Sequence, residues 1–210
     1  MNDFTGSHRC KWQNIISPEQ HIGLIVVTIG EYSTVIYNEN TEKTEVVTGK
    51  NAITIFDSLP IVELCTEKKS KRCFGVISNV EPANLEIIGT GIGLKSAYTR
   101  PENDQRIEIN GVGEGAIWVC NIEGNIYYGD YITTSIIPGY GEVQNDDILH
   151  NYTVAKATCN VDFTDITILE TKYQIRFLET NGTIITKEMY ELDQTNRYIA
   201  VFIGCSYHCS

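Results

Sequence analysis

Short runs of alternating apolar and polar residues, each ended by a turn, fill the chain from Arg106 to Phe163. These runs are rich in β-branched and aromatic residues, which is typical of strands. The expected strand segments are 107–112, 116–120, 126–128, 131–132 and 154–157. Glycine-centred turns separate them, and the loop Pro138–Gly141 is the largest excursion. The pattern predicts a compact antiparallel β module.

Strand-like runs continue on both sides of this module. They are the apolar or alternating segments 23–29, 61–65, 73–78 and 198–204. The pair Asn181-Gly182, between residues 173–178 and 183–186, is the strongest hairpin signal in the chain. There is no sustained apolar stripe with a period of 3.6 residues, so helix should be minor, with one short helical turn at 187–192.

The predicted fold class is therefore mainly β: an antiparallel β-rich module of short strands, barrel-like or β-clip-like, with a C-terminal hairpin and minor helix. A chain of 210 residues with 42% hydrophobic residues suits one domain with a real core. We expect this single domain to consist of a junction segment (1–20), an N-terminal β region (21–105), a central module (106–165), a hairpin appendage (166–192) and a closing strand (193–210).

Acidic residues outnumber basic ones, 27 against 16, and the formal net charge is −11. Nucleic acid is therefore not expected as a partner, because contacts to phosphates need clustered Lys and Arg. The basic cluster at residues 68–72 is predicted to be a solvated turn. No membrane span is expected, because no uncharged apolar run is long enough, and the N-terminus lacks the apolar region of a signal peptide.

The seven cysteines are an odd number, and most of them sit in apolar runs. A free thiol in such a run behaves as a small buried hydrophobe. With no secretory signal, we expect a reducing compartment and no disulfide framework. No cofactor or metal is expected; the weak candidates for zinc-type ligands stand near the two ends of the chain and are His8, Cys10, Cys205, His208 and Cys209.

Longer motifs carry a resemblance that covers nearly the whole chain. The central ones are GDYITTSIIPGYG and DDILHNYTVAKAT. FTGSHRC precedes them near the start, SLPIVELC and CFGVISN stand in between, and VFIGCSYHCS closes the sequence. Together they resemble the peptidase G2 domain, also known as the intramolecular chaperone autoproteolytic domain, of phage tail spikes and of fibre-like proteins from large DNA viruses.

The resemblance implies a homotrimer at the C-terminal end of a viral fibre or tail spike. Its partners would be further copies of itself and the upstream fibre shaft, which the trimer brings into register. The expected location is a virion appendage, made in the host cytoplasm. Family members cut their own chain once, just before this domain, so the resemblance also implies a self-cleaving endopeptidase of the glutamic or aspartic type.

The catalytic acid cannot be transferred from the family by position. Family members carry an acidic, aromatic-rich motif at the junction, whereas FTGSHRC stands there in this chain. The chemistry needs an acid held against a strained peptide bond and a polar group for the leaving amine. The candidates, near the junction and in the segment NDDILHN, are Asp3, Ser7, His8, Asp146, Asp147 and His150. The structural alternative is an exposed acidic turn for the two central aspartates and a hydrogen-bonding role for His150.

A second hypothesis belongs to the binding class: an uncut module at the tip of a fibre that binds a host-surface glycan or protein receptor. Tyr98, Tyr127, Tyr128 and Tyr140 could supply the contacts, unless they are core residues. A separate hydrolase is the least supported hypothesis, because no histidine stands in a local signature such as G-x-S-x-G.

Overall fold

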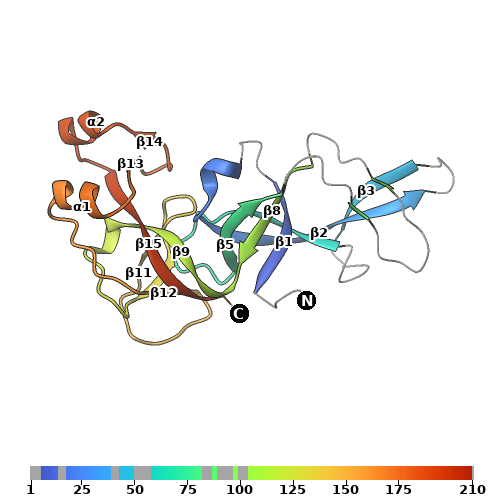
Figure 1. The fold of residues 1–210 in the computed structure, drawn as a ribbon, viewed down its shortest axis with the longest axis horizontal. Coiled ribbons are helices and arrows are strands. Elements are labelled where there is room, and N and C mark those ends of the chain that lie inside the picture. Colours follow the sequence, from blue (N-terminus) through green and yellow to red (C-terminus); the bar gives the residue numbers. More distant parts are fainter. Residues whose placement is uncertain are drawn as a thin grey trace.

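The computed structural model describes residues 6–13, 18–38, 43–49, 58–81, 87–88, 97–98 and 104–209. Over these residues the protein is mainly β with little helix, which confirms the predicted fold class (Figure 1). The strands of the first half are β1 (Ser7–Trp12), β2 (Ile25–Asn38), β3 (Lys43–Gly49), β4 (Ser58–Leu64), β5 (Cys73–Val80), β6 (Ile87–Ile88), β7 (Ala97–Tyr98) and β8 (Arg106–Asn110).

The second half adds shorter strands and the helices. The strands are β9 (Val112–Cys120), β10 (Tyr131–Thr134), β11 (Gly141–Val143), β12 (Thr153–Ala157), β13 (Ile175–Glu179), β14 (Ile184–Ile185) and β15 (Arg197–His208). The helical segments are η1 (Pro18–His21), η2 (Asn121–Glu123), α1 (Ile166–Lys172) and α2 (Lys187–Leu192). The hairpin at Asn181-Gly182 and the helix at 187–192 are where the sequence predicts them.

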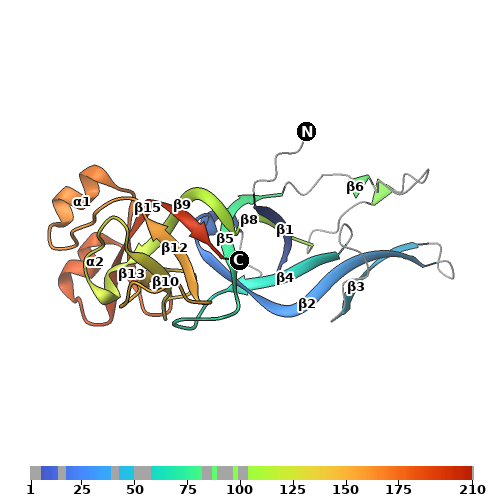
Figure 2. The same ribbon diagram turned by 90° about the horizontal axis from the view of Figure 1, so that it is seen from below.

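The first sheet closes into a five-stranded barrel, in which β2, β4, β1, β8 and β5 pair in turn and β5 returns to β2. The outer half of β2 runs on beyond the barrel and pairs with β3 (Figure 2). Ile107 and Ile109 of β8 point into the barrel while Glu108 between them is partly exposed, as the period of two requires. The barrel core contains Cys10, Trp12, Val26, Val62, Ile77, Ile107 and Ile109.

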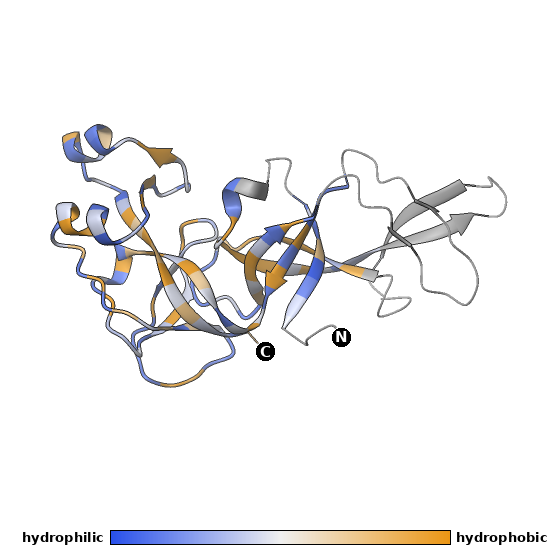
Figure 3. Ribbon diagram, viewed as in Figure 1, coloured by the Kyte–Doolittle hydropathy of each residue, from blue (hydrophilic) through white to orange (hydrophobic). Residues whose placement is uncertain are grey.

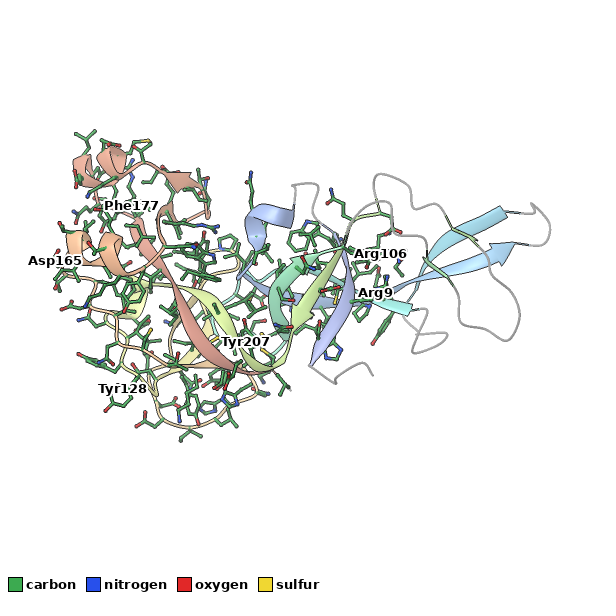
Figure 4. The ribbon with its side chains drawn as sticks, viewed as in Figure 1. Arg9, Arg106, Tyr128, Asp165, Phe177 and Tyr207 are labelled. Carbon is green, nitrogen blue, oxygen red and sulfur yellow. The ribbon has the colours of Figure 1, made fainter. Side chains whose placement is uncertain are left out.

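The second sheet is built around β15, which pairs with β9, β12 and β13. Its strand order is β12-β10-β11-β9-β15-β13-β14, and the pairing of β12 with β15 closes a second ring. The apolar strands of this sheet surround its core, and α1 and α2 lie at its outer end (Figures 1 and 3). Among the side chains labelled in Figure 4, Phe177 on β13 packs on Tyr190 of α2, with ring centroids 5.0 Å apart.

The predicted central module is not one sheet, which corrects the sequence analysis. The chain crosses from the first sheet to the second at Gly111, so that β8 pairs with β1 and β5 whereas β9 pairs with β15. The pairing is also not wholly antiparallel, because β1 runs parallel to β4 and β9 runs parallel to β11. Hydrophobic periodicity shows which residues are buried, but not which sheet buries them.

Two local predictions were wrong. Residues 126–128 do not form a strand: Ile126 makes an isolated bridge with Val161, and a turn follows. Side chains bind the backbone there, since Tyr127 N donates to Asp130 Oδ2 (2.7 Å) and Tyr128 N donates to Asn160 Oδ1 (2.7 Å). Helix α1 was missed; it begins after Asp165, whose carboxylate accepts a hydrogen bond from the backbone N–H three residues on.

The loop Pro138–Gly141 joins the two sheets through its glycine. Gly139 N donates to Cys65 O (2.7 Å), just after β4, and Ile25 N of β2 donates to Gly139 O (2.7 Å). Gly139 has a φ of 80°, and a Cβ there would lie 2.8 Å from Leu64 Cδ2 and 2.9 Å from Leu24 Cβ. Only glycine gives both this backbone conformation and this close approach without strain.

The basic turn at residues 66–72 is also a link between the sheets rather than a merely solvated loop. Thr134 Oγ1, at the end of β10, donates to Glu67 O (2.7 Å) and accepts from Ser70 N (2.8 Å). Lys69 N donates to the backbone oxygen of Thr134 (3.2 Å). The charge pattern of this turn did not reveal these contacts, because backbone groups and a buried hydroxyl make them.

We predict that Gly139→Ala lowers the free energy of unfolding by about 2–4 kcal/mol, because it adds steric overlap to backbone strain. Gly30→Ala is the matched control, since Gly30 also has a φ of 80° but has open space where a Cβ would lie. It should cost only about 1–2 kcal/mol of strain. Urea unfolding of both variants measures the difference, and equal losses would show that the close approach of Gly139 is unimportant.

Candidate functional site

Residues 144–152, between β11 and β12, form a loop fixed by its own polar side chains; we call it the braced loop. Gln144 is buried, and its Nε2 donates to Asp146 O (3.1 Å), Asp146 Oδ1 (2.9 Å) and Ile148 O (2.7 Å). Its Oε1 accepts a hydrogen bond from Thr153 Oγ1 (2.6 Å). One amide therefore holds both ends of the loop, so that the loop has a defined conformation although it contains no helix or strand.

Asp146 and His150 form a pair inside this loop. His150 Nε2 lies 3.0 Å from Asp146 Oδ1, and the imidazole stacks on Tyr152 with ring centroids 4.6 Å apart. Hydrogen bonds hold the pKa of Asp146 below its usual value, chiefly the bond from Ile148 N and then those from His150 and Gln144. Asp146 is therefore ionised at neutral pH, which suits it to orient His150 rather than to donate a proton.

In this arrangement His150 could act as a general base and Asp146 as the group that orients it. With Nε2 protonated and turned to Asp146, the Nδ1 of His150 is the atom that could accept a proton. Asp147 is exposed, and among the described residues no hydrogen bond or ion pair joins it to Asp146 or His150. Of the three candidates in NDDILHN, the structure brings together Asp146 and His150, and leaves Asp147 outside.

Two of the three junction candidates lie on the first sheet. Ser7 and His8 are exposed on β1, with the His8 ring 5.7 Å from the ring of Phe74, and Asp3 lies outside the described residues. The start of β1 is nevertheless connected to β12, the strand that follows the braced loop, through a chain of contacts. Gly111 N donates to Gly6 O (3.0 Å), a Cβ on Gly111 would lie 3.1 Å from Cys209 O, and Cys209 Sγ contacts Val154 O (3.4 Å) just beyond the loop.

The weak metal candidates lie in separate surroundings. Cys10 belongs to the core of the first barrel and Cys205 to the core of the second sheet, while the His208 ring packs edge-on against Tyr131. Cys209 Sγ lies 3.4 Å from Cys73 Sγ, and both thiols are free. Within the part of the chain that the structure describes, no three His, Cys, Asp or Glu side chains are grouped to hold a metal ion.

Glu142 is a buried acid that the sequence analysis missed. Its side chain on β11 is 0% exposed, and Lys68 Nζ from the basic turn lies 2.8 Å from its Oε1. Neither carboxylate oxygen accepts a hydrogen bond, and burial raises the pKa of Glu142 although the lysine opposes that shift. Lys68 also pairs with Glu123. No signal in the sequence marks this acid, because its partner belongs to the other sheet.

The tyrosines of the binding hypothesis divide into two kinds. Tyr127 and Tyr128 are exposed in the turn before β10, at the edge of the second sheet, where Figure 4 labels Tyr128. Tyr140 is buried, and its hydroxyl accepts a hydrogen bond from Arg176 Nη1 (3.0 Å). Tyr98 lies in β7, and nothing is described of its side chain. Two of the four are therefore available at the surface.

Comparison with known proteins identifies no relative: no protein-family model, no curated protein and no solved structure matches the chain. Among the described residues, no helix has both the length and the apolar character needed to cross a bilayer.

We predict that Glu142→Gln raises the free energy of unfolding at pH 7 by about 1 kcal/mol, because it removes a buried charge while Lys68 keeps Glu123 as a partner. Because the pKa of Glu142 is higher in the folded than in the unfolded protein, the ionised carboxylate costs stability above that pKa. The advantage of the variant should therefore shrink as the pH falls toward the usual carboxyl value of 4.5. Urea unfolding of both proteins across this range tests it, and a constant difference would contradict it.

Proposed function

We propose that the protein is an assembly domain that forms a homotrimer, as the intramolecular chaperone of a viral fibre or tail spike. The observation that carries this proposal is the pair Ile148 and Leu149 at the tip of the braced loop, which are 63% and 56% exposed. Five internal hydrogen bonds that involve Gln144, Asp146 and Thr153 hold this loop in place. Single exposed apolar residues are common, but two adjacent ones on such a fixed loop favour a contact surface.

The rigidity of the loop matters for binding. A flexible loop loses conformational entropy when it docks, whereas the braced loop is ordered before any partner arrives. Gln144 binds the backbone oxygen of Ile148, and His150 binds Asp146, so these two polar groups stay paired when another surface covers the tip. The loop is thus suited to insert its apolar tip into a partner surface at little cost.

The partner that we propose is a second and a third copy of this chain. The motifs GDYITTSIIPGYG and DDILHNYTVAKAT, on which the resemblance to the trimeric chaperone domains rests, flank and include the braced loop. In a closed trimer each copy would present its loop to the next, and every loop would be covered. Burial of these surfaces offsets the entropy of aligning three upstream shafts, and those shafts would form the virion appendage on the completed particle.

The same proposal includes a single self-cleavage upstream of Gly6. The Asp146–His150 pair supplies an oriented base, and the contacts from Gly6 through Gly111 and Cys209 to Val154 bring the start of β1 toward the loop that carries the pair. Water would attack the carbonyl carbon of the scissile peptide while His150 accepts its proton. The peptide C–N bond then breaks and the protonated His150 returns the proton to the leaving amine, within one chain or between neighbours in the trimer.

We expect light scattering to show a trimer for the natural chain at micromolar concentration, and a monomer for the double variant Ile148→Lys/Leu149→Lys. Two lysines at the centre of an interface would each cost at least about 2 kcal/mol of association free energy. The matched control is Leu192→Lys, because Leu192 is 85% exposed on α2 and outside the braced loop. The control should remain trimeric. A monomeric natural chain would refute the assembly proposal.

For self-cleavage, we expect the chain extended by its natural upstream sequence to yield a single cut before Gly6, visible on a gel and located by N-terminal sequencing. Asp146→Asn should abolish the cut, because His150 loses its orienting carboxylate. Asp147→Asn, the adjacent exposed acid, should cleave normally. An uncut extended chain that is trimeric would refute the cleavage step and leave the assembly role standing.

A further inference from the structure

A cavity of about 340 Å³ lies where the hairpin β13–β14 approaches the loop Pro138–Gly141, well separated in sequence from the braced loop. Its walls come from both sheets, with Leu24 and Leu64 from the first and Arg176, Asn181 and Thr183 from the second. The turn of the hairpin packs against the loop, since a Cβ on Gly182 would lie 3.3 Å from Pro138 Cδ. The volume lies at the small end of the range of about 300–1,000 Å³ usual for ligand pockets.

Arg176 holds a fixed position in this cavity. Its guanidinium lies over the ring of Trp118, 4.0 Å from the ring centroid. Nη1 donates to Tyr140 Oη (3.0 Å) and Nη2 donates to the backbone oxygen of Gln20 (3.2 Å). Three different elements therefore orient the cation before any ligand binds, and these bonds use only two of the five N–H donors of a guanidinium.

Arg176 differs from the other described arginines, because no described acid pairs with it. Every other arginine in the described part of the chain pairs with a carboxylate: Arg9 with Glu81, Arg72 with Glu63 and Glu67, Arg106 with Asp104, and Arg197 with Glu179. Arg176 makes no ion pair with a described residue, and the described lining of the cavity contains no Asp or Glu. A partly buried cation in a concave site without a counter-ion favours an anionic ligand.

The rest of the lining narrows the class of ligand. Leu64, Pro138 and Ile184 offer apolar surface, whereas Asn181 and Thr183 offer an amide and a hydroxyl at the rim. A sugar ring has the same mixture, with an apolar face of C–H groups and a rim of hydroxyls. A carboxylate on that ring could take both free N–H groups on one side of the Arg176 fork.

We propose that this cavity binds a sugar that carries a carboxylate, of the uronic acid class. The described lining residues all belong to one chain, and we expect the site to bind its ligand without the trimer. It gives the chain a binding activity besides the proposed assembly role, and none of the described lining residues belongs to the braced loop.

The test uses the full chain and saturation-transfer NMR with three probes at equal ionic strength. Sodium D-glucuronate has the ring and the carboxylate, D-glucose has the ring alone, and sodium acetate has the carboxylate alone. We expect saturable transfer to glucuronate and only background transfer to the other two. An equal response to glucose or to acetate would overturn the proposal, as would the absence of any saturable response to glucuronate.

Two variants connect the signal to the site. Arg176→Gln should weaken glucuronate binding roughly 10- to 100-fold, the effect of losing a charge-assisted bidentate contact. Asn181→Asp should weaken it similarly without touching the contacts of Arg176. The aspartate keeps the oxygen that accepts Thr183 N (2.9 Å), so the turn is preserved, but it adds a negative charge at the rim. Unchanged affinity in Asn181→Asp, with its melting temperature intact, would overturn the proposal.

The same samples separate this inference from the assembly proposal. Light scattering on each variant should show the oligomeric state of the natural chain, because neither substitution alters the braced loop. Loss of glucuronate binding in a protein of unchanged oligomeric state supports the cavity site. Glucuronate binding by the Ile148→Lys/Leu149→Lys variant would show that the site works without the trimer.

Discussion

The insertion of Gly139 between two strands of the first barrel is the contact on which the rest of the arrangement depends. Its N–H and C=O bond to the end of β4 and to the start of β2, so a loop of the second sheet takes part in the hydrogen bonding of the first. Side chains on either side, Leu24 and Leu64, approach the glycine too closely to admit any other residue. Because of this contact the two sheets behave as one packed body, and the cavity at Arg176 has walls from both.

The second sheet uses polar residues in two contrasting ways. Gln144, Asp146 and Thr153 satisfy one another and fix a loop, whereas Glu142, two residues before Gln144, is buried with an ion-pair contact but no hydrogen bond. A satisfied network stabilises a conformation, and an incompletely satisfied acid costs stability. The two acids differ both in the number of donors that they receive and in burial, since the Glu142 side chain is 0% exposed and that of Asp146 is 37% exposed.

The sequence is sufficient for much of the fold, because alternation and turn chemistry are local. The strands around Ile117 and Ile199 and the Asn181-Gly182 hairpin follow from such signals. The division between sheets at Gly111 does not, since partners such as β1 and β8 are distant in sequence. The proximity of Asp146 and His150 was predictable from their spacing. The pairing of Lys68 with Glu142 and the isolated charge of Arg176 were not, because they depend on which distant segments meet.

The central place of β15 has a consequence for the timing of synthesis. This strand pairs with β9, β12 and β13, all of which leave the ribosome earlier. Until the residues of β15 emerge, β9, β12 and β13 lack the strand with which all three pair. The strand β12, which follows the Ile148–Leu149 tip, is then not held on that side. In the proposed assembly, copies made on one messenger would therefore recognise each other only after each polypeptide has been made through His208.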